Sequence, residues 1–210
     1  MRIYQICTIF ARSKISSIPL KMMKYNEIKT FVFNTLNREY WIRQSLEIRN
    51  IPPAKDKGRD TITILFSDSI VSLDPMHIVL LSCIIENLKE KDFLIWLKAV
   101  NKKLDHFINE NVAFKKYWEG GKGDHIDSPD SARLNLWRIT DAGKEGYSIS
   151  VENYFKTLFP EKDLSSLRTV LNELYFNVFD HADAKNNAFS YIYYDEHVHK
   201  IYNECPQISN

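Results

Sequence analysis

The chain has 210 residues, 44% hydrophobic and 26% charged, which is long enough for one large or two small domains and excludes a disordered chain. Its 28 basic and 27 acidic residues give a net charge of +1, which argues against nucleic acid or an anionic membrane as a partner bound through bulk charge. Three widely spaced cysteines (Cys7, Cys83, Cys205) exclude a disulfide framework and a zinc set and favour a reducing, cytoplasmic location, and no apolar run has the length of a membrane span.

Residues 1–23 differ from the rest because they carry four basic residues and no acid. The apolar stretch 3–10 is not followed by a small-residue cleavage site, so a signal peptide is weakly supported. We expect an extension without structure of its own, and the sequence leaves open whether translation begins at Met1, Met22 or Met23.

Residues 24–57 read as a helical lead-in, because apolar residues recur at spacings of three and four: Ile28, Phe31, Val32, Leu36, Tyr40 and Trp41. A domain over 58–142 follows. It contains predicted strands over 61–66, 93–100 and 132–140 and helices from Asp74-Pro75 to Leu88 and over 102–118. This order predicts an α/β layer with covering helices, bounded by a polar linker over 141–146.

The glycine cluster over 120–124 allows two interpretations, a phosphate loop or a surface loop. It lacks the spacing and the Gly-Lys-Ser/Thr end of a phosphate loop, so we expect a surface loop. The remaining region, 147–210, predicts helices over 148–159 and 164–182 and then a hairpin of strands over 188–195 and 198–204.

The helix over 164–182 has a core-facing apolar stripe formed by Leu164, Leu167, Leu171, Leu174 and Val178. A second stripe, formed by Glu173, Asn177, Asp180 and His181, lies roughly 115° from the first at about 100° per residue. A carboxylate, an amide oxygen and an imidazole at this spacing suit a cation or a phosphate-bound water. The alternative is the solvated face of an ordinary amphipathic helix.

Residues 173–182 (ELYFNVFDHA) resemble the N-box of the GHKL-type ATPases, which include histidine kinases and anti-sigma serine kinases. The family pattern is Glu-Leu-x-x-Asn-Ala/Val-x-x-His-Gly/Ala, and each position is matched. The resemblance implies a Bergerat-type α/β sandwich that binds Mg-ATP. It implies that Asn177 is a ligand of the magnesium ion, Glu173 the general base or water-orienting residue, and His181 a residue near the phosphates, with Asp180 peripheral.

The family's adenine-reading Asp-x-Gly-x-Gly motif and its glycine-rich lid have no counterpart here, because the last glycine is Gly146. The chain therefore resembles the front portion of such a sandwich, an incomplete one. A complete member would hydrolyse ATP or phosphorylate a protein. From this chain we expect no measurable ATPase or kinase activity and weak or absent ATP binding. A fragment and a natural truncation both stay open.

The strand, Leu73-Asp74-Pro75, helix, strand and helix of the middle region are similar to the STAS (anti-sigma-antagonist-like) domains. Pro75 stands where phosphorylated members carry a serine, so the resemblance implies a module that is not a phospho-switch of that type. Two functions follow: an ATP-binding regulatory protein, or a non-enzymatic STAS-like module that binds a regulatory protein partner. An open sheet edge near Ile201 would favour a homodimer.

The histidines outside the helix offer weaker signals. His197 and His199 lack a third ligand and read as surface residues of the hairpin. His77, His106 and His125 have no partner that sequence spacing identifies.

Overall fold

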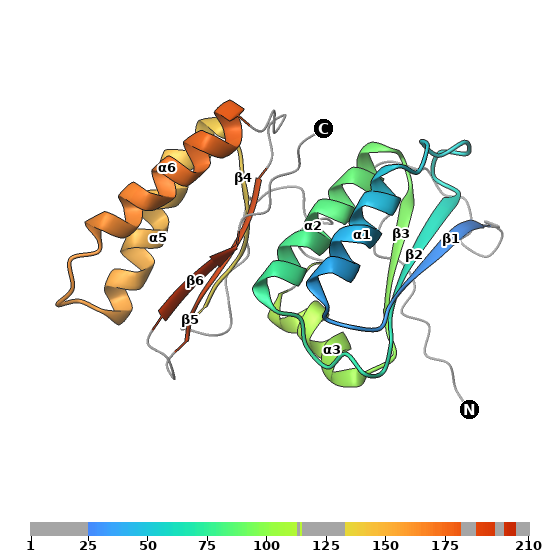
Figure 1. Cartoon of the computed structure of the whole chain (residues 1–210), viewed down its shortest axis with the longest axis horizontal. Helices are drawn as coiled ribbons and strands as arrows, with labels where there is room; N and C mark the ends of the chain where they lie inside the picture. The colour runs from blue at the N-terminus through green and yellow to red at the C-terminus, as the bar shows by residue number, and fades with distance from the viewer. Residues whose placement is uncertain (1–24, 113, 115–132, 182–187, 196–199, 205–210) are drawn as a thin grey trace, which may run out of the picture. The chain divides into compact units, whose positions relative to one another are not determined.

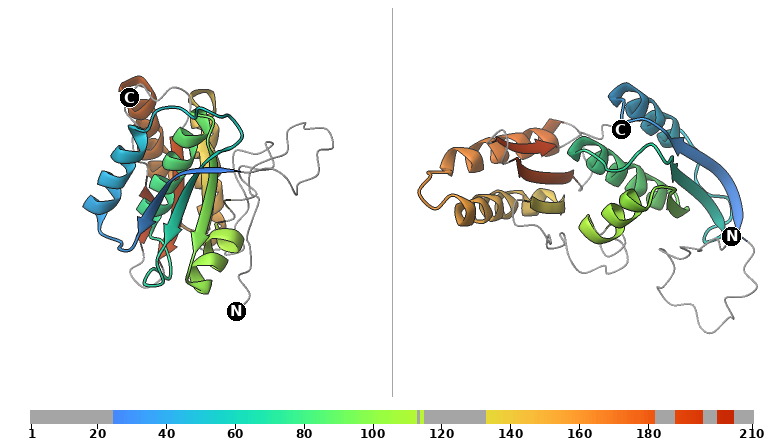
Figure 2. Two further views of the ribbon diagram at one scale, coloured as in Figure 1. Left: turned by 90° about the vertical axis from the view of Figure 1, so that its right-hand side faces the viewer. Right: turned by 90° about the horizontal axis from the view of Figure 1, so that it is seen from below.

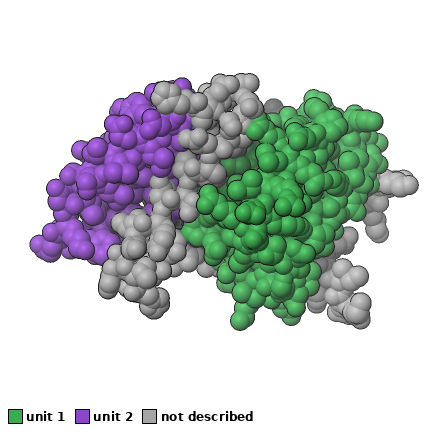
Figure 3. Space-filling model, in the orientation of Figure 1, with its two compact units in different colours: residues 1–122 green, residues 123–210 purple. Residues whose placement is uncertain are grey.

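A computed structural model describes residues 25–112, 114, 133–181, 188–195 and 200–204. The chain divides into two compact units, residues 1–122 and residues 123–210, which Figure 3 shows in green and purple. The predicted extension over 1–23, the glycine cluster over 120–124 and the pair His197 and His199 lie outside the described residues. Within the described residues, no helix is both long and apolar enough to cross a membrane.

Unit 1 is built on a parallel sheet of three strands in the order β1-β2-β3. The strands are β1 (Asn26–Phe33), β2 (Asp60–Phe66) and β3 (Leu94–Ala99), joined by α1 (Arg38–Arg49) and α2 (Pro75–Glu90). Both crossovers step in the same direction across the sheet, so right-handed connections place both helices on one face. Figures 1 and 2 show α1 and α2 side by side over that face.

The first element corrects the sequence prediction, because residues 26–33 form a strand and not a helix. Phe31 and Phe33 are buried while Val32 between them is 42% exposed, which is the two-residue alternation of a strand. The helix begins only at Arg38, after Asn37 caps it by accepting from the Tyr40 amide. The apolar residues of this strand and of the following helix together recur at spacings of three and four, so the sequence pattern predicted a single helix.

The core of unit 1 contains an aromatic cluster where α1 meets β1 and β2. The Phe33 ring lies 4.3 Å from that of Trp41 and 5.7 Å from that of Phe66, measured between centroids. All three side chains are fully buried. Buried aromatic rings contribute strongly to core stability, so this cluster helps to join α1 to the two strands.

The helix α2 begins where Asp74-Pro75 predicts it, with one difference at its cap. The Asp74 side chain makes no capping hydrogen bond. Its carboxylate lies 3.6 Å from Nδ1 of His77 instead. After β3 the chain forms α3 (Lys102–His106) and a π-helical turn, η2 (Phe107–Asn111), so the described start of the predicted helix over 102–118 changes from α-helical to π-helical at Phe107.

Unit 2 is an antiparallel sheet in the order β4-β5-β6 with two helices packed against each other. Its elements are β4 (Arg133–Ile139), the single 3₁₀ turn η3 (Asp141–Gly143), α5 (Lys144–Leu158), α6 (Ser165–His181), β5 (Ala188–Asp195) and β6 (Lys200–Glu204). Figure 1 shows α5 and α6 on the same side of the three strands. The mixed α/β class, the long helix and the terminal hairpin are confirmed.

The strand β4 also corrects a prediction. Its existence over 132–140 is confirmed, but it pairs with β5 and does not extend the parallel sheet. The connection over 141–146, predicted as a linker between domains, forms η3 and the start of α5 within unit 2. The paired residues of β4 and β5 are 49–60 positions apart, so the sequence pattern within either strand does not show which partner it has.

Candidate functional site

The helix α6 separates its apolar and polar residues as the sequence predicts. Of the predicted apolar stripe, Leu171 and Val178 are buried in the core of unit 2 with 1% exposure, and Leu164, Leu167 and Leu174 are partly buried. Tyr175, which the predicted stripe did not include, is also fully buried. Glu173 and Asn177 are exposed one helical turn apart. The structure thus brings these two predicted site residues to one exposed surface of the helix.

The position of α5 shows which flank of α6 carries this pair. Arg168 of α6 reaches across to Glu152 of α5, with Nη1 and Oε2 3.4 Å apart. At about 100° per residue, Asn177 lies about 180° around the helix from Arg168, and Glu173 about 140° from it. Glu173 and Asn177 are therefore on the flank of α6 that is turned away from α5.

The other two predicted residues lie close to this pair on the helix. Asp180 is exposed and lies about 20° around the helix from Glu173, so the two acids share the outer side of α6 opposite the core. His181 is the last residue of α6, and its side chain lies outside the described part of the chain. The backbone position of His181, one turn after Asn177, keeps it on the same flank of the helix.

The donor set on this flank suits magnesium better than a transition metal. Glu173 and Asn177 offer oxygen atoms, which hard cations prefer, and Mg²⁺ commonly takes one or two protein ligands and completes its shell with water and phosphate oxygens. Across the described residues no group of three or more His, Cys, Asp or Glu side chains could hold a metal ion alone. The pair itself could supply two oxygen ligands to such a cation.

Two contacts with α5 hold α6 in place. The Glu152 carboxylate, 6% exposed, lies between Lys156 at 2.6 Å and Arg168. The Tyr147 ring of α5 packs edge-on against Tyr175, with 5.3 Å between centroids. A helix held on its core face and on its α5 flank presents the opposite flank as a rigid surface.

A second candidate surface lies at the carboxyl edge of the parallel sheet in unit 1. Each strand there is followed by an exposed aliphatic residue: Leu36 after β1, Val71 after β2 and Val100 after β3, with exposures of 39%, 49% and 59%. The sequence alone does not indicate this surface, because the loops that carry the three residues share one edge only if the strands are parallel and adjacent.

Side-chain hydrogen bonds to backbone carbonyls tie these three loops together. The Ser69 hydroxyl donates to the Asn34 carbonyl at 3.1 Å, which joins the β2 loop to the β1 loop. Asn101 Nδ2 donates to the Asp68 carbonyl at 3.2 Å, which joins the β3 loop to the β2 loop. The exposed aliphatic residues therefore lie on loops that are joined to one another by hydrogen bonds.

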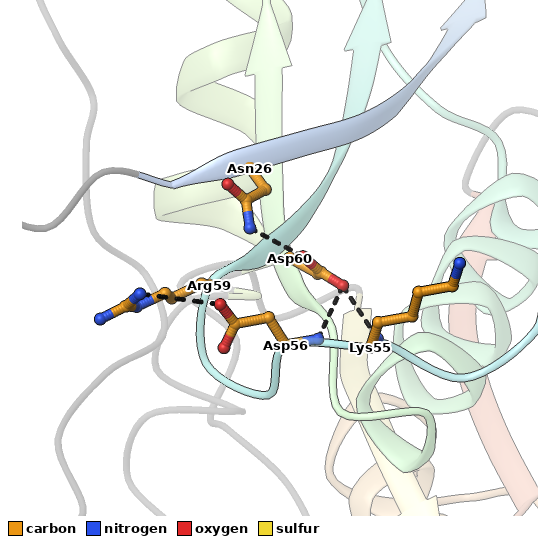
Figure 4. Close-up of polar contacts among 5 residues, drawn as sticks. All are labelled: Asn26, Lys55, Asp56, Arg59 and Asp60. Carbon is orange, nitrogen blue, oxygen red and sulfur yellow. Dashed lines mark hydrogen bonds and ion pairs between the residues drawn. The ribbon is translucent and has the colours of Figure 1, made fainter.

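The opposite edge of this sheet holds a polar cluster, drawn in Figure 4, that is structural. Asp60 accepts from the backbone amides of Lys55 and Asp56 at 2.9 and 3.0 Å and from Asn26 Nδ2 at 3.2 Å. Three donors satisfy most of the capacity of a carboxylate that is only 4% exposed. The cluster closes the loop before β2 and fastens it to β1.

Comparison of the chain with protein-family models, with curated proteins and with solved structures found no match. The geometry of the two surfaces is therefore the basis for a functional proposal.

Proposed function

We propose that this chain is an ATP-binding regulatory protein in which unit 2 is a GHKL-type module with the Bergerat arrangement and unit 1 a STAS-like module. The observation that carries the proposal is the pair Glu173 and Asn177, exposed one turn apart on the flank of α6 turned away from α5. The N-box sequence supplies the family resemblance, and the rigid helix supplies a surface on which those residue types are free to meet a ligand.

The roles of the residues follow from their chemistry. Asn177 offers an uncharged oxygen to a magnesium ion that also bridges the phosphates of ATP. Glu173, one turn earlier, is placed to orient or deprotonate a water or hydroxyl group near the terminal phosphate. His181 extends the same flank toward the phosphates. The adenine-reading motif has no counterpart in the printed sequence, so the proposal assigns this chain the phosphate and magnesium contacts only.

The proposal is tested by titrating the ¹⁵N-labelled chain with Mg-ATP and following backbone and side-chain amides by NMR, which detects weak binding. We expect magnesium-dependent shifts that concentrate on α6 around Glu173 and Asn177, without turnover of ATP. Asn177→Ala should abolish the shifts and Glu173→Gln should leave binding largely intact, because a water-orienting residue contributes little to the ground state.

Matched controls use exposed residues of the same type on α5. Asn153→Ala and Glu145→Gln repeat the two changes on a different helix, and both should leave the titration unchanged. Shifts that persist in Asn177→Ala, or that appear equally on α5, would refute the proposed site. Micromolar affinity for Mg-ATP would refute the expectation of weak binding while supporting the site.

A second function, protein binding by unit 1 alone, is favoured by the exposed trio Leu36, Val71 and Val100. Each of three loops joined by hydrogen bonds carries one exposed aliphatic residue. Such residues are suited to form the apolar centre of a protein interface. The proposed occupant is a regulatory protein that presents an apolar patch to this edge, in line with the STAS resemblance.

This second function is tested with a photo-crosslinking amino acid at Val71 or Val100 and, as control, at Leu46. Leu46 is 53% exposed on α1 and lies outside the trio. Two results together would support this function. The crosslinker should give the same defined adduct at Val71 and at Val100, and the purified protein in that adduct should bind the unmodified chain more tightly than the double variant Val71→Ser/Val100→Ser. The same adducts from Leu46, or unchanged affinity of the double variant, would refute it.

A further inference from the structure

The imidazole of His77 is buried in the first turn of α2 and holds a loop that is 41 positions away in sequence. His77 is 1% exposed, and its Nε2 lies 3.0 Å from the carbonyl oxygen of Leu36. A carbonyl oxygen accepts only, so Nε2 carries the proton and donates it. The neutral ring therefore has its lone pair on Nδ1.

A second buried ring holds the neighbouring carbonyl of the same loop. Trp41 Nε1 donates to the Thr35 carbonyl at 2.8 Å, and the Trp41 and His77 rings pack edge to face with 4.6 Å between centroids. Residues 34–37, which connect β1 to α1, are thus fastened by two side chains from α1 and α2. Breaking either contact would leave a carbonyl without its donor.

Among the described residues, Nδ1 of His77 has no hydrogen-bond partner. The Asp74 Oδ2 atom lies 3.6 Å from Nδ1, beyond hydrogen-bond range, and the Asp74 side chain is 67% exposed. Burial is the largest influence on this imidazole and lowers the pKa of His77, while the Leu36 carbonyl and the Asp74 charge act in the opposite direction. The parts of α1 and of the loop that meet the ring, the Trp41 indole and the Leu36 carbonyl, do not titrate.

We propose that His77 is a pH-sensitive latch: it holds residues 34–37 closed when neutral and, when it takes up a proton at Nδ1, opens that loop to hydrate the charged ring. The Nε2–H bond survives protonation, so the driving force is the unfavourable burial of an imidazolium and not the loss of a donor. Leu36 belongs to the exposed trio, so opening would remodel the carboxyl edge of the sheet. The latch itself requires neither of the functions proposed above.

The size of the effect follows from proton linkage. A ring that opens into water regains its ordinary pKa of about 6.5, so the equilibrium constant for opening should rise about tenfold for each pH unit below that value. The rise ends where the closed form itself takes up the proton. Above about pH 7 the latch should be insensitive to pH.

The test is amide and indole hydrogen exchange of the full chain, measured by NMR and corrected for the pH dependence of intrinsic exchange. As the pH falls below about 6.5, protection of the Trp41 indole N–H should fall by up to about tenfold for each pH unit, while the Ile64 amide in the centre of the sheet keeps its protection. An equal loss at Ile64 would indicate general acid unfolding and would overturn the latch.

Variants separate His77 from the other titrating groups. His77→Gln retains an amide donor for the Leu36 carbonyl but cannot be charged, so protection at Trp41 should become independent of pH. His106→Gln, on an exposed histidine of α3, should behave as the unmodified chain. Persistence of the pH dependence in His77→Gln would refute the proposal.

A measurement on the unmodified chain covers the case in which His77→Gln does not fold. The ring nitrogen shifts of His77 should show the Nε2–H tautomer at neutral pH, and its titration should coincide with the loss of protection at Trp41. A His77 that titrates at its ordinary pKa without any change at Trp41 would equally refute the latch.

Discussion

Glu152 and Arg168 join the two helices of unit 2: the carboxylate is 6% exposed on α5, and an oxygen of it lies 3.4 Å from Nη1 of the α6 arginine. Lys156 approaches the other oxygen at 2.6 Å, so one buried acid is shared by two bases. The arginine side chain is 46% exposed, so water screens part of this attraction.

Removing this acid should loosen α6. We expect Glu152→Ala to lower the free energy of unfolding by about 1–3 kcal/mol, because two ion pairs of a buried carboxylate are lost and a buried space is left. Denaturant titration followed by circular dichroism measures it. Glu161→Ala, on an exposed glutamate of the α5–α6 loop, is the control and should change the free energy by less than about 0.5 kcal/mol. Equal effects of both changes would contradict the assigned role.

The Tyr147 hydroxyl and the Ser190 hydroxyl lie 2.5 Å apart in the core of unit 2 and connect α5 to β5. Tyr147→Phe should destabilise the chain by about 1–2 kcal/mol. In a cycle with Ser190→Ala, the double variant should lose less than the sum of the single variants, with a coupling of at least about 0.5 kcal/mol. Strict additivity would show that the two hydroxyls do not depend on each other.

Asp60 should make unit 1 sensitive to acid. The backbone amide of Asp56 is the largest influence and lowers the pKa of Asp60, with help from Asn26 and Lys55 and against the effect of burial. The folded pKa is below the unfolded one, so this stabilisation is complete above about pH 4–5 and is lost as the pH falls through the folded pKa. Asp60→Asn should therefore flatten the acid limb of a plot of unfolding free energy against pH. An unchanged limb in this variant would assign acid sensitivity to other groups.

Two glycines should respond to alanine in opposite directions. Gly58 has a φ of +79°, which strains any L side chain although nothing lies within 4 Å, so Gly58→Ala should destabilise by about 1 kcal/mol. Gly146 lies in α5 with open space around it, so Gly146→Ala should stabilise by about 0.5–1 kcal/mol. Thermal unfolding of the two variants compares them directly, and a shift of the same sign in both would contradict the argument.

The exposed polar residues of α6 could be predicted from the sequence, because the spacing of residues along a helix fixes the directions of their side chains relative to one another. Leu171, Tyr175 and Val178 are buried while Glu173 and Asn177 are exposed, which the 3.6-residue period already implies. The direction of the open flank could not be read in the same way. It depends on where α5 packs, and the contact of Arg168 with Glu152 decides that.

Local sequence thus determined the mixed α/β class, the long helix with its two faces and the terminal hairpin, because these follow from periodicity and turn residues within one segment. Tertiary structure alone decided that residues 26–33 are a strand, that β4 pairs with β5, and that His77 is buried against the Leu36 carbonyl. Those outcomes rest on pairing and burial between segments far apart in the chain. The free energy of such contacts arises only when the two segments meet, so the sequence of one segment does not reveal it.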